Sequence, residues 1–447
     1  MKRYDLAVVG TGTAAMVAAM RVRAAGWTVA VIDHRPFGGT CALRGCDPKK
    51  MLVGGASALD YARRMRGKGI AGEVRIDWSE LLAFERTFTD AVPAQHEASY
   101  AAMGIDAYHG RARFSAHNVL EVQGAPLEAR YVLLAAGAEP ARLGIAGEER
   151  LITSEQFLQL DELPRRIVLV GGGYIAAEFS HIAARAGAKV TILQRAPRLL
   201  TRFDPDCVGW LMEAFAGWRI EVRTRATVQA IEKHDAVFVV RAEADHQPLA
   251  VEADLVVHAA GRAPALEPLD LDAAGVQTEK GRLKLNEYLQ SVSNAAVYAA
   301  GDAAQMGPPL TPVSSHDAQV AAANIVRGNH AKPDYRAVPS VAFSIPPIAA
   351  VGLSEKAAHE QGLRFRVNSA KASDWFSARQ AAEPVYGYKV LVEEGSGRIL
   401  GAHLVGPHAD EVINVFALAM RHGLAADALR DTLFAYPTGA SDIGYML

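Results

Sequence analysis

The chain has 447 residues, more than one compact domain usually holds, so we expect two to four units. Half of the residues are apolar, only 7% are aromatic and Gly numbers 39. This mixture favours α/β layers, in which small residues let helices approach a sheet. The formal net charge of −2 gives no reason to expect nucleic acid or an anionic membrane as a partner.

The N-terminal segment, MKRYDLAVVGTGTAA, begins as a signal peptide does, with basic residues before apolar ones. Glycines interrupt the apolar run at once, so we interpret it as the first strand of the fold. No stretch approaches about 18 apolar residues, the length that predicts a membrane span. We therefore expect a cytoplasmic protein with no membrane partner.

The first predicted element pair is a nucleotide-binding unit. The strand 5–9 (DLAVV) leads into Gly10-Thr11-Gly12-Thr13-Ala14-Ala15, then an Ala-rich helix to Gly26 and a second strand that ends at Asp33. Glycines in this turn let the backbone approach a pyrophosphate, and the start of the helix offers unpaired N–H groups. Asp33 is placed to accept from a ribose hydroxyl.

Two of the three cysteines follow directly in the segment GGTCALRGCDPKK. Cys41 and Cys46 are five positions apart at a helical start, close enough to bridge if the turn is slightly distorted. A metal site would need further Cys or His ligands nearby, and a structural disulfide is unusual in a reducing compartment. A redox-active pair is the favoured interpretation, with Cys207 an ordinary packed or surface residue.

A second nucleotide-binding unit begins at 166–170 (RIVLV) and continues through Gly171-Gly172-Gly173-Tyr174-Ile175-Ala176, a helix to Gly187 and the strand AKVTIL. Here Gln194-Arg195 stands where Asp33 closes the first unit, with Arg198 and Arg202 close behind. Arginines without the acid favour the 2′-phosphate of NADPH over NADH, although these arginines are also compatible with a solvated surface.

Three later features complete the pattern. The strand segments YVLLAAGAEP and LVVHAAGRAP end in small residues, and AVYAAGDAA ends in Gly301-Asp302, a carboxylate placed to hold a polyol. From about residue 338, alternating strands and a helix predict a separate α+β unit.

These motifs, in this order, resemble the pyridine nucleotide-disulfide oxidoreductase family, which includes glutathione reductase, dihydrolipoamide dehydrogenase and mercuric reductase. The resemblance rests on GTGTAA, GGTCALRGCDPKK, GGGYIAAEF, AAGRAP, YAAGDAA, LTPVSSHDAQVAAANI and RILGAHLVGPHADEVI. It implies an α/β fold with two Rossmann-like domains, for FAD and NAD(P)H, and a C-terminal α+β dimerisation domain. The implied divisions are 1–145 and 265–335 for FAD, 146–264 for the nicotinamide cofactor and 336–447 for the interface of a homodimer.

The resemblance also implies residue roles. Cys46 would face the flavin as the charge-transfer thiolate, and Cys41 would attack the substrate disulfide. Lys50 would lie by flavin N5 and pair with Glu178, and Tyr174 would be the gate for nicotinamide. Further expected cofactor contacts are Gly10, Gly12, Thr13, Ala14, Asp33, His34, Gly39, Thr40, Ala112, Ala136, Gly137, Gly171, Gly173, Ile175, Arg195, Arg198, Gly261, Arg262, Gly301, Asp302, Leu310 and Thr311; with Pro312, the last two would line the pyrimidine side. No metal site is expected.

The C-terminus departs from the family pattern. Where relatives carry a His-Pro-Thr-x-x-Glu motif, this chain has Tyr436-Pro437-Thr438-Gly439-Ala440-Ser441, followed by Asp442. A phenol ordinarily titrates near 10 and is a poor base at neutral pH, whereas imidazole suits the task. Tyr436 is a candidate hydrogen-bond or proton donor, or a simple interface residue.

Three functions follow from the sequence. The first is an NADPH-dependent reductase of a small or protein-borne disulfide. The second uses the same flavin to reduce oxygen, a quinone or a metal ion, which the loss of the histidine favours; the absence of a C-terminal cysteine pair argues against a standard mercuric reductase. The third is a redox-sensing subunit that binds FAD without turnover. The sequence does not name the electron acceptor.

Overall fold

The computed structural model describes residues 1–447, which divide into two units. Unit 1 comprises Met1–Pro48, Phe84–Ala141 and Arg262–Tyr335; unit 2 comprises Lys49–Ala83, Arg142–Gly261 and Arg336–Leu447. Two helices, α3 (Cys46–Arg64) and α4 (Trp78–Thr89), run across the boundaries in sequence. The four predicted domain ranges are a finer division and stay a prediction.

Unit 1 is built on one seven-stranded sheet in which β3-β2-β1-β6-β5-β4 are neighbours and β18 pairs with β6. The pairs β1–β2, β1–β6, β2–β3 and β6–β18 are parallel. The strands are β1 (Lys2–Val9), β2 (Val29–Asp33), β3 (Asp106–His109), β4 (Ala112–Ala116), β5 (Val119–Val122), β6 (Ala125–Leu134) and β18 (Val297–Ala299). The helices are α1 (Thr13–Ala24), α2 (Gly39–Arg44), α5 (Val92–Met103) and α9 (Thr311–Arg327).

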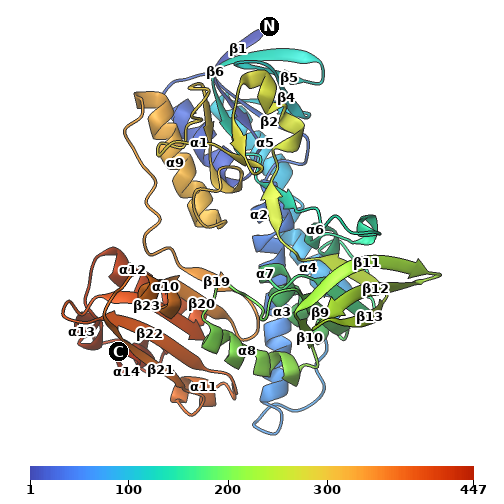
Figure 1. Ribbon diagram of the computed structural model, residues 1–447, viewed down its shortest axis with the longest axis vertical. Helices are drawn as coiled ribbons and strands as arrows, with labels where there is room; N and C mark the ends of the chain where they lie inside the picture. Colours follow the sequence, from blue (N-terminus) through green and yellow to red (C-terminus); the bar gives the residue numbers. More distant parts are fainter. The chain divides into compact units, whose positions relative to one another are not determined.

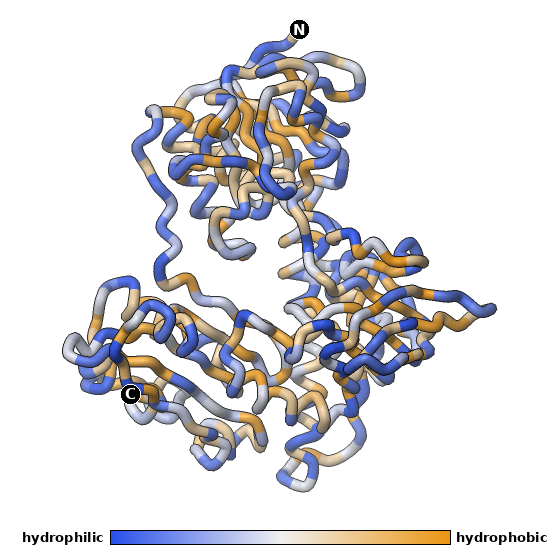
Figure 2. The backbone as a smooth tube through the Cα atoms, in the orientation of Figure 1, coloured by the Kyte–Doolittle hydropathy of each residue, from blue (hydrophilic) through white to orange (hydrophobic).

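The central strand β1 is buried on both faces, as the apolar run DLAVV predicts. Leu6 and Val8 pack with α1 and α9 in one cluster, whereas Ala7 and Val9 pack with β4 and β5 in another. In Figure 1, α1 and α9 lie side by side. Figure 2 shows hydrophobic residues concentrated in the interior of this part of the chain. Small residues line α1, and they let it approach the sheet closely.

Unit 2 contains three sheets. The parallel sheet β10-β9-β8-β14 is the second nucleotide-binding core, and an antiparallel sheet β11-β12-β13 adjoins it in sequence. Their strands are β8 (Arg166–Val170), β9 (Lys189–Gln194), β10 (Glu221–Thr224), β11 (Ala226–His234), β12 (Val237–Ala244), β13 (Gln247–Ala253) and β14 (Leu255–His258). The helices of this part are α6 (Ser154–Phe157), α7 (Tyr174–Arg185) and α8 (Pro205–Gly217).

The third sheet of unit 2 is antiparallel, in the order β19-β20-β23-β22-β21, and α12 packs on β20 and β23. This is the α+β unit that the sequence predicts from about residue 338. Its strands are β19 (Ser340–Ala342), β20 (Ile348–Gly352), β21 (Phe365–Lys371), β22 (Gly387–Glu393) and β23 (Ile399–Val405). Its helices are α10 (Glu355–Glu360), α11 (Phe376–Arg379), α12 (Ala409–Arg421), α13 (Ala426–Arg430) and α14 (Ile443–Met446).

Unit 1 also contains two short two-stranded sheets. One pairs β7 (Ala138–Pro140) with β15 (Arg262–Pro264), and the other pairs β16 (Thr278–Glu279) with β17 (Arg282–Leu283). No helix of the structure combines the length and apolar character needed to cross a membrane.

Candidate functional site

The glycine turn of unit 1 has the geometry that a pyrophosphate cradle needs. Gly10 has φ of +110°, and a Cβ there would lie 2.4 Å from the carbonyl oxygen of Ala135. Gly39 has φ of +73°, and a Cβ there would lie 2.3 Å from Cα of Gly12. Side chains are excluded at both places, so two backbone segments approach each other at the start of α1. The residues present therefore fit the FAD that the sequence predicts.

Asp33, which ends β2, holds this turn in place. Its carboxylate accepts from the Thr11 amide at 3.0 Å, from the Thr11 hydroxyl at 2.8 Å and from the Arg35 amide at 3.0 Å. The predicted contact of Asp33 with a ribose stays a prediction, since a carboxylate has further acceptor positions. Its neighbour His34 is partly exposed, and burial is the main cause that lowers the pKa of its imidazole.

Asp302 lies just beyond β18, at the same edge of the sheet as the sequence predicts. Burial raises the pKa of its carboxyl, and Arg262 opposes that shift. Ala112 is buried at the start of β4, whereas Ala136, Gly137 and Leu310 are partly exposed. The structure brings most of the predicted FAD residues into unit 1; their individual contacts stay predictions.

The two cysteines belong to different helices. Cys41 lies in α2 and Cys46 begins α3, because Gly45 interrupts the helix with φ of −149° and ψ of −105°. A Cβ at Gly45 would lie 2.9 Å from the carbonyl oxygen of Thr40, so glycine alone fits this break. The distortion that the spacing of the cysteines requires is therefore a complete interruption between two helices.

Thr311, the first residue of α9, connects the two thiols. Its hydroxyl donates to Cys41 Sγ at 3.1 Å and lies 3.5 Å from Cys46 Sγ. Both cysteines are free thiols here; Cys41 is half-buried and Cys46 is exposed. The hydrogen bond with Cys46, followed by burial, raises the pKa of Cys41, and the bond from Thr311 opposes this rise. The family resemblance implied that Thr311 contacts the flavin. Its contact with the two sulfurs is visible only in the structure, because Thr311 lies far from the cysteines in the sequence.

Asp47 follows Cys46 and is exposed, as the sequence allows. Desolvation raises the pKa of its carboxyl, and its charge adds to the rise of the Cys41 pKa. Cys207 is buried, and burial raises the pKa of its thiol, so it is the ordinary packed residue that was expected.

The predicted ion pair of Lys50 with Glu178 is wrong. Glu178 pairs instead with Lys49, whose Nζ lies 2.8 Å from Glu178 Oε1, and both side chains are less than a tenth exposed. The same carboxylate oxygen accepts from the Phe343 amide at 2.8 Å. Lys50 is half exposed and lies 3.6 Å from Asp410. Adjacent residues of a helix point about 100° apart, and here Lys49 is directed to Glu178 while Lys50 is directed to Asp410.

The second glycine turn is also formed as predicted. Gly171 has φ of +113°, and a Cβ there would lie 2.2 Å from the carbonyl oxygen of Ala259. Tyr174 begins α7 and packs edge-on against Phe203, with ring centroids 5.6 Å apart. Burial raises the pKa of the Tyr174 phenol. The turn can hold a nicotinamide dinucleotide, while a gating role of Tyr174 stays a prediction.

The arginines after β9 differ in their surroundings. Arg198 donates to the carbonyl oxygens of Phe203 at 2.8 Å, Thr201 at 3.0 Å and Leu200 at 3.4 Å, so its guanidinium closes a loop. Arg195 is exposed immediately after the strand. Arg195 is therefore better placed than Arg198 to meet a phosphate.

The C-terminal segment offers one accessible group of the three considered. Ser441 and Thr438 form a capping box, and Asp442 is buried and accepts from the Tyr386 hydroxyl at 2.8 Å. Tyr436 is 77% exposed, with its ring 6.2 Å from that of Phe376. Of Tyr436, Ser441 and Asp442, Tyr436 is the exposed residue.

The comparisons with known proteins agree with this arrangement. The family model "Pyridine nucleotide-disulphide oxidoreductase" matches residues 4–318, and its dimerisation domain matches residues 338–446. A mercuric reductase of Staphylococcus aureus is 32% identical over 98% of this chain and 81% of its own length. A glutathione reductase of Burkholderia cepacia is 31% identical over 98% and 97% of the two chains. The solved Cu(II) complex of the HOCl-induced flavoprotein disulfide reductase RclA from Escherichia coli has a TM-score of 0.89 and 26% identity, covering 100% and 99% of the two chains.

Replacing Thr311 by Val should make the dithiol less reactive at neutral pH. The variant loses the hydroxyl that donates to Cys41 Sγ and lowers the pKa of that thiol, so the pKa of Cys41 rises and less thiolate is present at neutral pH. The rate of alkylation of the reduced protein against pH measures this. A Thr311→Ser variant keeps the hydroxyl and should match the wild type; an unchanged profile in Thr311→Val would contradict the role.

Lys49→Met should lower turnover at least about tenfold and also destabilise unit 2, because it leaves the Glu178 carboxylate buried without its cation. Lys50→Met is the matched control, since Lys50 is half exposed and its partner Asp410, at 3.6 Å, is itself partly exposed. NADPH oxidation rates and melting temperatures of both variants test the correction. Equal losses in the two variants would speak against it.

Proposed function

Because the chain belongs to the pyridine nucleotide-disulphide oxidoreductase family, we propose that it is an NADPH-dependent reductase that delivers electrons to a disulfide substrate through Cys41 and Cys46. The chain is a flavin-dependent pyridine nucleotide-disulfide oxidoreductase with a dimerisation domain, and its cofactors are FAD and a pyridine nucleotide. The observation that carries the proposal is the pair of thiols in contact with one hydroxyl, that of Thr311.

The thiol chemistry balances within the chain. With FAD bound, an electron pair from the nicotinamide would reduce the Cys41–Cys46 disulfide, and the two sulfurs would take up two protons to become thiols. Cys41, as a thiolate, then attacks one sulfur of the substrate disulfide and releases the first thiol. Cys46 attacks Cys41 in the mixed disulfide, which restores the intramolecular bond and releases the second thiol. Two electrons and two protons leave with the products.

The roles of the neighbouring residues are part of the proposal. Thr311 stabilises the attacking thiolate by the hydrogen bond that it donates. Lys49, paired with Glu178, takes the place that the sequence assigned to Lys50 beside the flavin. Tyr436 of the second chain in a homodimer approaches the dithiol and supplies a hydrogen bond to the leaving thiolate, which its exposure supports. A cytoplasmic location suits a chain with three free cysteines, two of them catalytic.

NADPH is the proposed donor because Arg195, and not an acid, follows β9. Its guanidinium is exposed and can bind a 2′-phosphate in bidentate fashion. Arg198 instead donates to the carbonyl oxygen of Phe203 and so stabilises the loop after β9.

A second candidate acceptor is a soft metal ion. Relatives with this fold include mercuric reductases and a reductase solved as a Cu(II) complex. Two adjacent thiols are ligands that soft ions prefer, and Tyr436 in place of histidine removes the usual base for thiol products. Reduction of one Hg(II) to Hg(0), or of two Cu(II) to Cu(I), would consume the electron pair that otherwise goes to a disulfide.

Arg195→Gln should raise the KM for NADPH about tenfold and leave the KM for NADH unchanged, because only the 2′-phosphate is lost as a partner. Steady-state kinetics with both nucleotides measure this. Arg225→Gln, an exposed arginine of the same part of unit 2, serves as the control. A parallel rise for NADH, or no change for NADPH, would remove the argument for NADPH.

A panel of acceptors tests the proposed function. We expect NADPH oxidation with at least one of oxidised glutathione, lipoamide and a protein disulfide, and a loss of at least about a hundredfold in Cys41→Ser, which lacks the attacking thiolate. Parallel assays use Hg(II) and Cu(II). Turnover with a metal ion and none with any disulfide would reject the disulfide substrate in favour of the second candidate.

A further inference from the structure

A buried ion network lies in unit 2, where the ends of α3 and α7 and the residue after α8 meet. Asp60, near the end of α3, accepts from Arg185 Nη2 at 2.6 Å and Nε at 3.1 Å, from Trp218 Nε1 at 2.7 Å and from Arg64 Nε at 2.8 Å. The side chains of Asp60 and Arg185 are 6% and 1% exposed. Buried charges are costly unless they are paired and hydrogen-bonded, so this network holds its members in one geometry.

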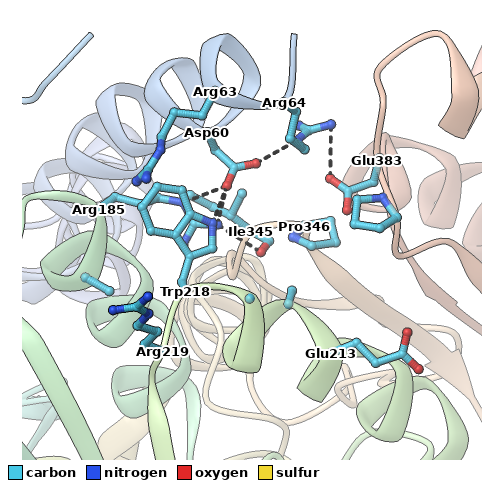
Figure 3. Close-up of a pocket in the computed structure, with 14 residues that line it drawn as sticks. Asp60, Arg63, Arg64, Arg185, Glu213, Trp218, Arg219, Ile345, Pro346 and Glu383 are labelled. Carbon is cyan, nitrogen blue, oxygen red and sulfur yellow. Dashed lines mark hydrogen bonds and ion pairs between the residues drawn. The ribbon is translucent and has the colours of Figure 1, made fainter. Parts of the chain in front are cut away.

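The network forms one wall of a cavity of about 650 Å³ (Figure 3). This volume falls within the range of small-molecule sites, roughly 300–1,000 Å³. Five segments of unit 2 contribute: the end of α3, the end of α7, α8 with the two residues after it, and the loops at Ile345-Pro346 and Glu383-Pro384. None of the lining residues belongs to the nucleotide turn at Gly171–Gly173.

The carboxylates of the cavity already have cationic partners. Asp60 is held by the network, Glu213 pairs with Lys371, and Glu383 lies 3.4 Å from Arg64 Nη1. Arg63 and Arg219 are exposed, line the cavity and form no ion pair. The cavity therefore carries an excess of positive charge.

The ring of Trp218 holds two of the guanidinium groups of the cavity in position. The guanidinium of Arg63 lies 4.4 Å from the ring centroid, and that of Arg185 lies 4.3 Å from it. Figure 3 shows Arg63 beside the ring and Arg219 at the border of the same space. A guanidinium stacked on an aromatic ring keeps its N–H groups directed outward at its edge, where they can bind a phosphate in bidentate fashion.

Glu383 adds a further favourable condition. Burial raises the pKa of its carboxyl to about 7, against the opposing effect of Arg64 and Arg185 and with a contribution from Asp60. At neutral pH this carboxyl is thus partly protonated and repels an anion less than an ordinary glutamate would.

We propose that this cavity binds a small phosphate-bearing anion through Arg63 and Arg219, at a site separate from both dinucleotides. Arg64 and Trp218, held by Asp60, provide the rigid wall against which the anion rests. This proposal does not depend on which electron acceptor the enzyme uses or on whether it prefers NADPH to NADH.

Isothermal titration calorimetry of the FAD-containing protein with pyrophosphate tests the proposal, at constant ionic strength and with saturating NADP⁺ so that the phosphate positions of the nucleotide turn are filled. We expect one pyrophosphate per chain. The double variant Arg63→Gln/Arg219→Gln should bind at least about tenfold more weakly, because two charge-assisted contacts are lost. Arg66→Gln, an exposed arginine just beyond α3 that does not line the cavity, should bind as the wild type does.

Both substituted positions are exposed, so melting temperatures equal to the wild type are expected and identify a specific loss of binding. Single variants at Arg63 and Arg219 should each show part of the effect. No binding in the presence of NADP⁺, or equal affinity in the double variant, would overturn the proposal.

Discussion

The break between α2 and α3 at Gly45 is the constraint on which the rest of the site depends. It turns a five-residue spacing into two side chains that meet at the hydroxyl of Thr311. A Cβ at Gly45 would strike the Thr40 carbonyl, so the position of Cys41 relative to Cys46 is set by the backbone. The same break starts α3 at Cys46, and the helical phase that follows decides which lysine is directed inward.

That inward lysine is Lys49, three residues after Cys46. Its ion pair with Glu178 joins α3 to α7 inside unit 2. Glu178 also accepts from the Phe343 amide, so one carboxylate connects α3, α7 and the residue that follows β19. Removing either Lys49 or Glu178 leaves the other charge buried without its partner. The pair is thus a structural requirement as well as a candidate contributor to the electrostatics around the flavin.

Local sequence patterns predicted the parts of the fold that depend on local physics. The strand DLAVV, the glycine turns at Gly10 and Gly171 and the Ala-rich helices all occur where periodicity and turn chemistry put them. The pairing of Lys50 with Glu178 was implied by the family resemblance, and the sequence offered no correction. Lys49 and Lys50 lie three and four residues after Cys46, and both positions fall on the same side of a helix, so spacing does not choose between them. The network of Asp60 joins residues 125 and 158 positions apart in the chain, and no local pattern reveals such contacts. The hydrogen bonds of Arg198 within the loop after β9 were also not predicted, because they depend on the conformation of that loop.

The most direct test of the central claim, that the Cys41–Cys46 pair carries the electrons, is an anaerobic NADPH titration of the FAD-containing protein with thiols counted by alkylation after denaturation. We expect uptake of about two hydride equivalents per FAD, with two more alkylated thiols per chain than in the oxidised protein. Cys41→Ser should take up about one equivalent and gain no thiols. Uptake of one equivalent by the wild type, with no new thiols, would contradict the account.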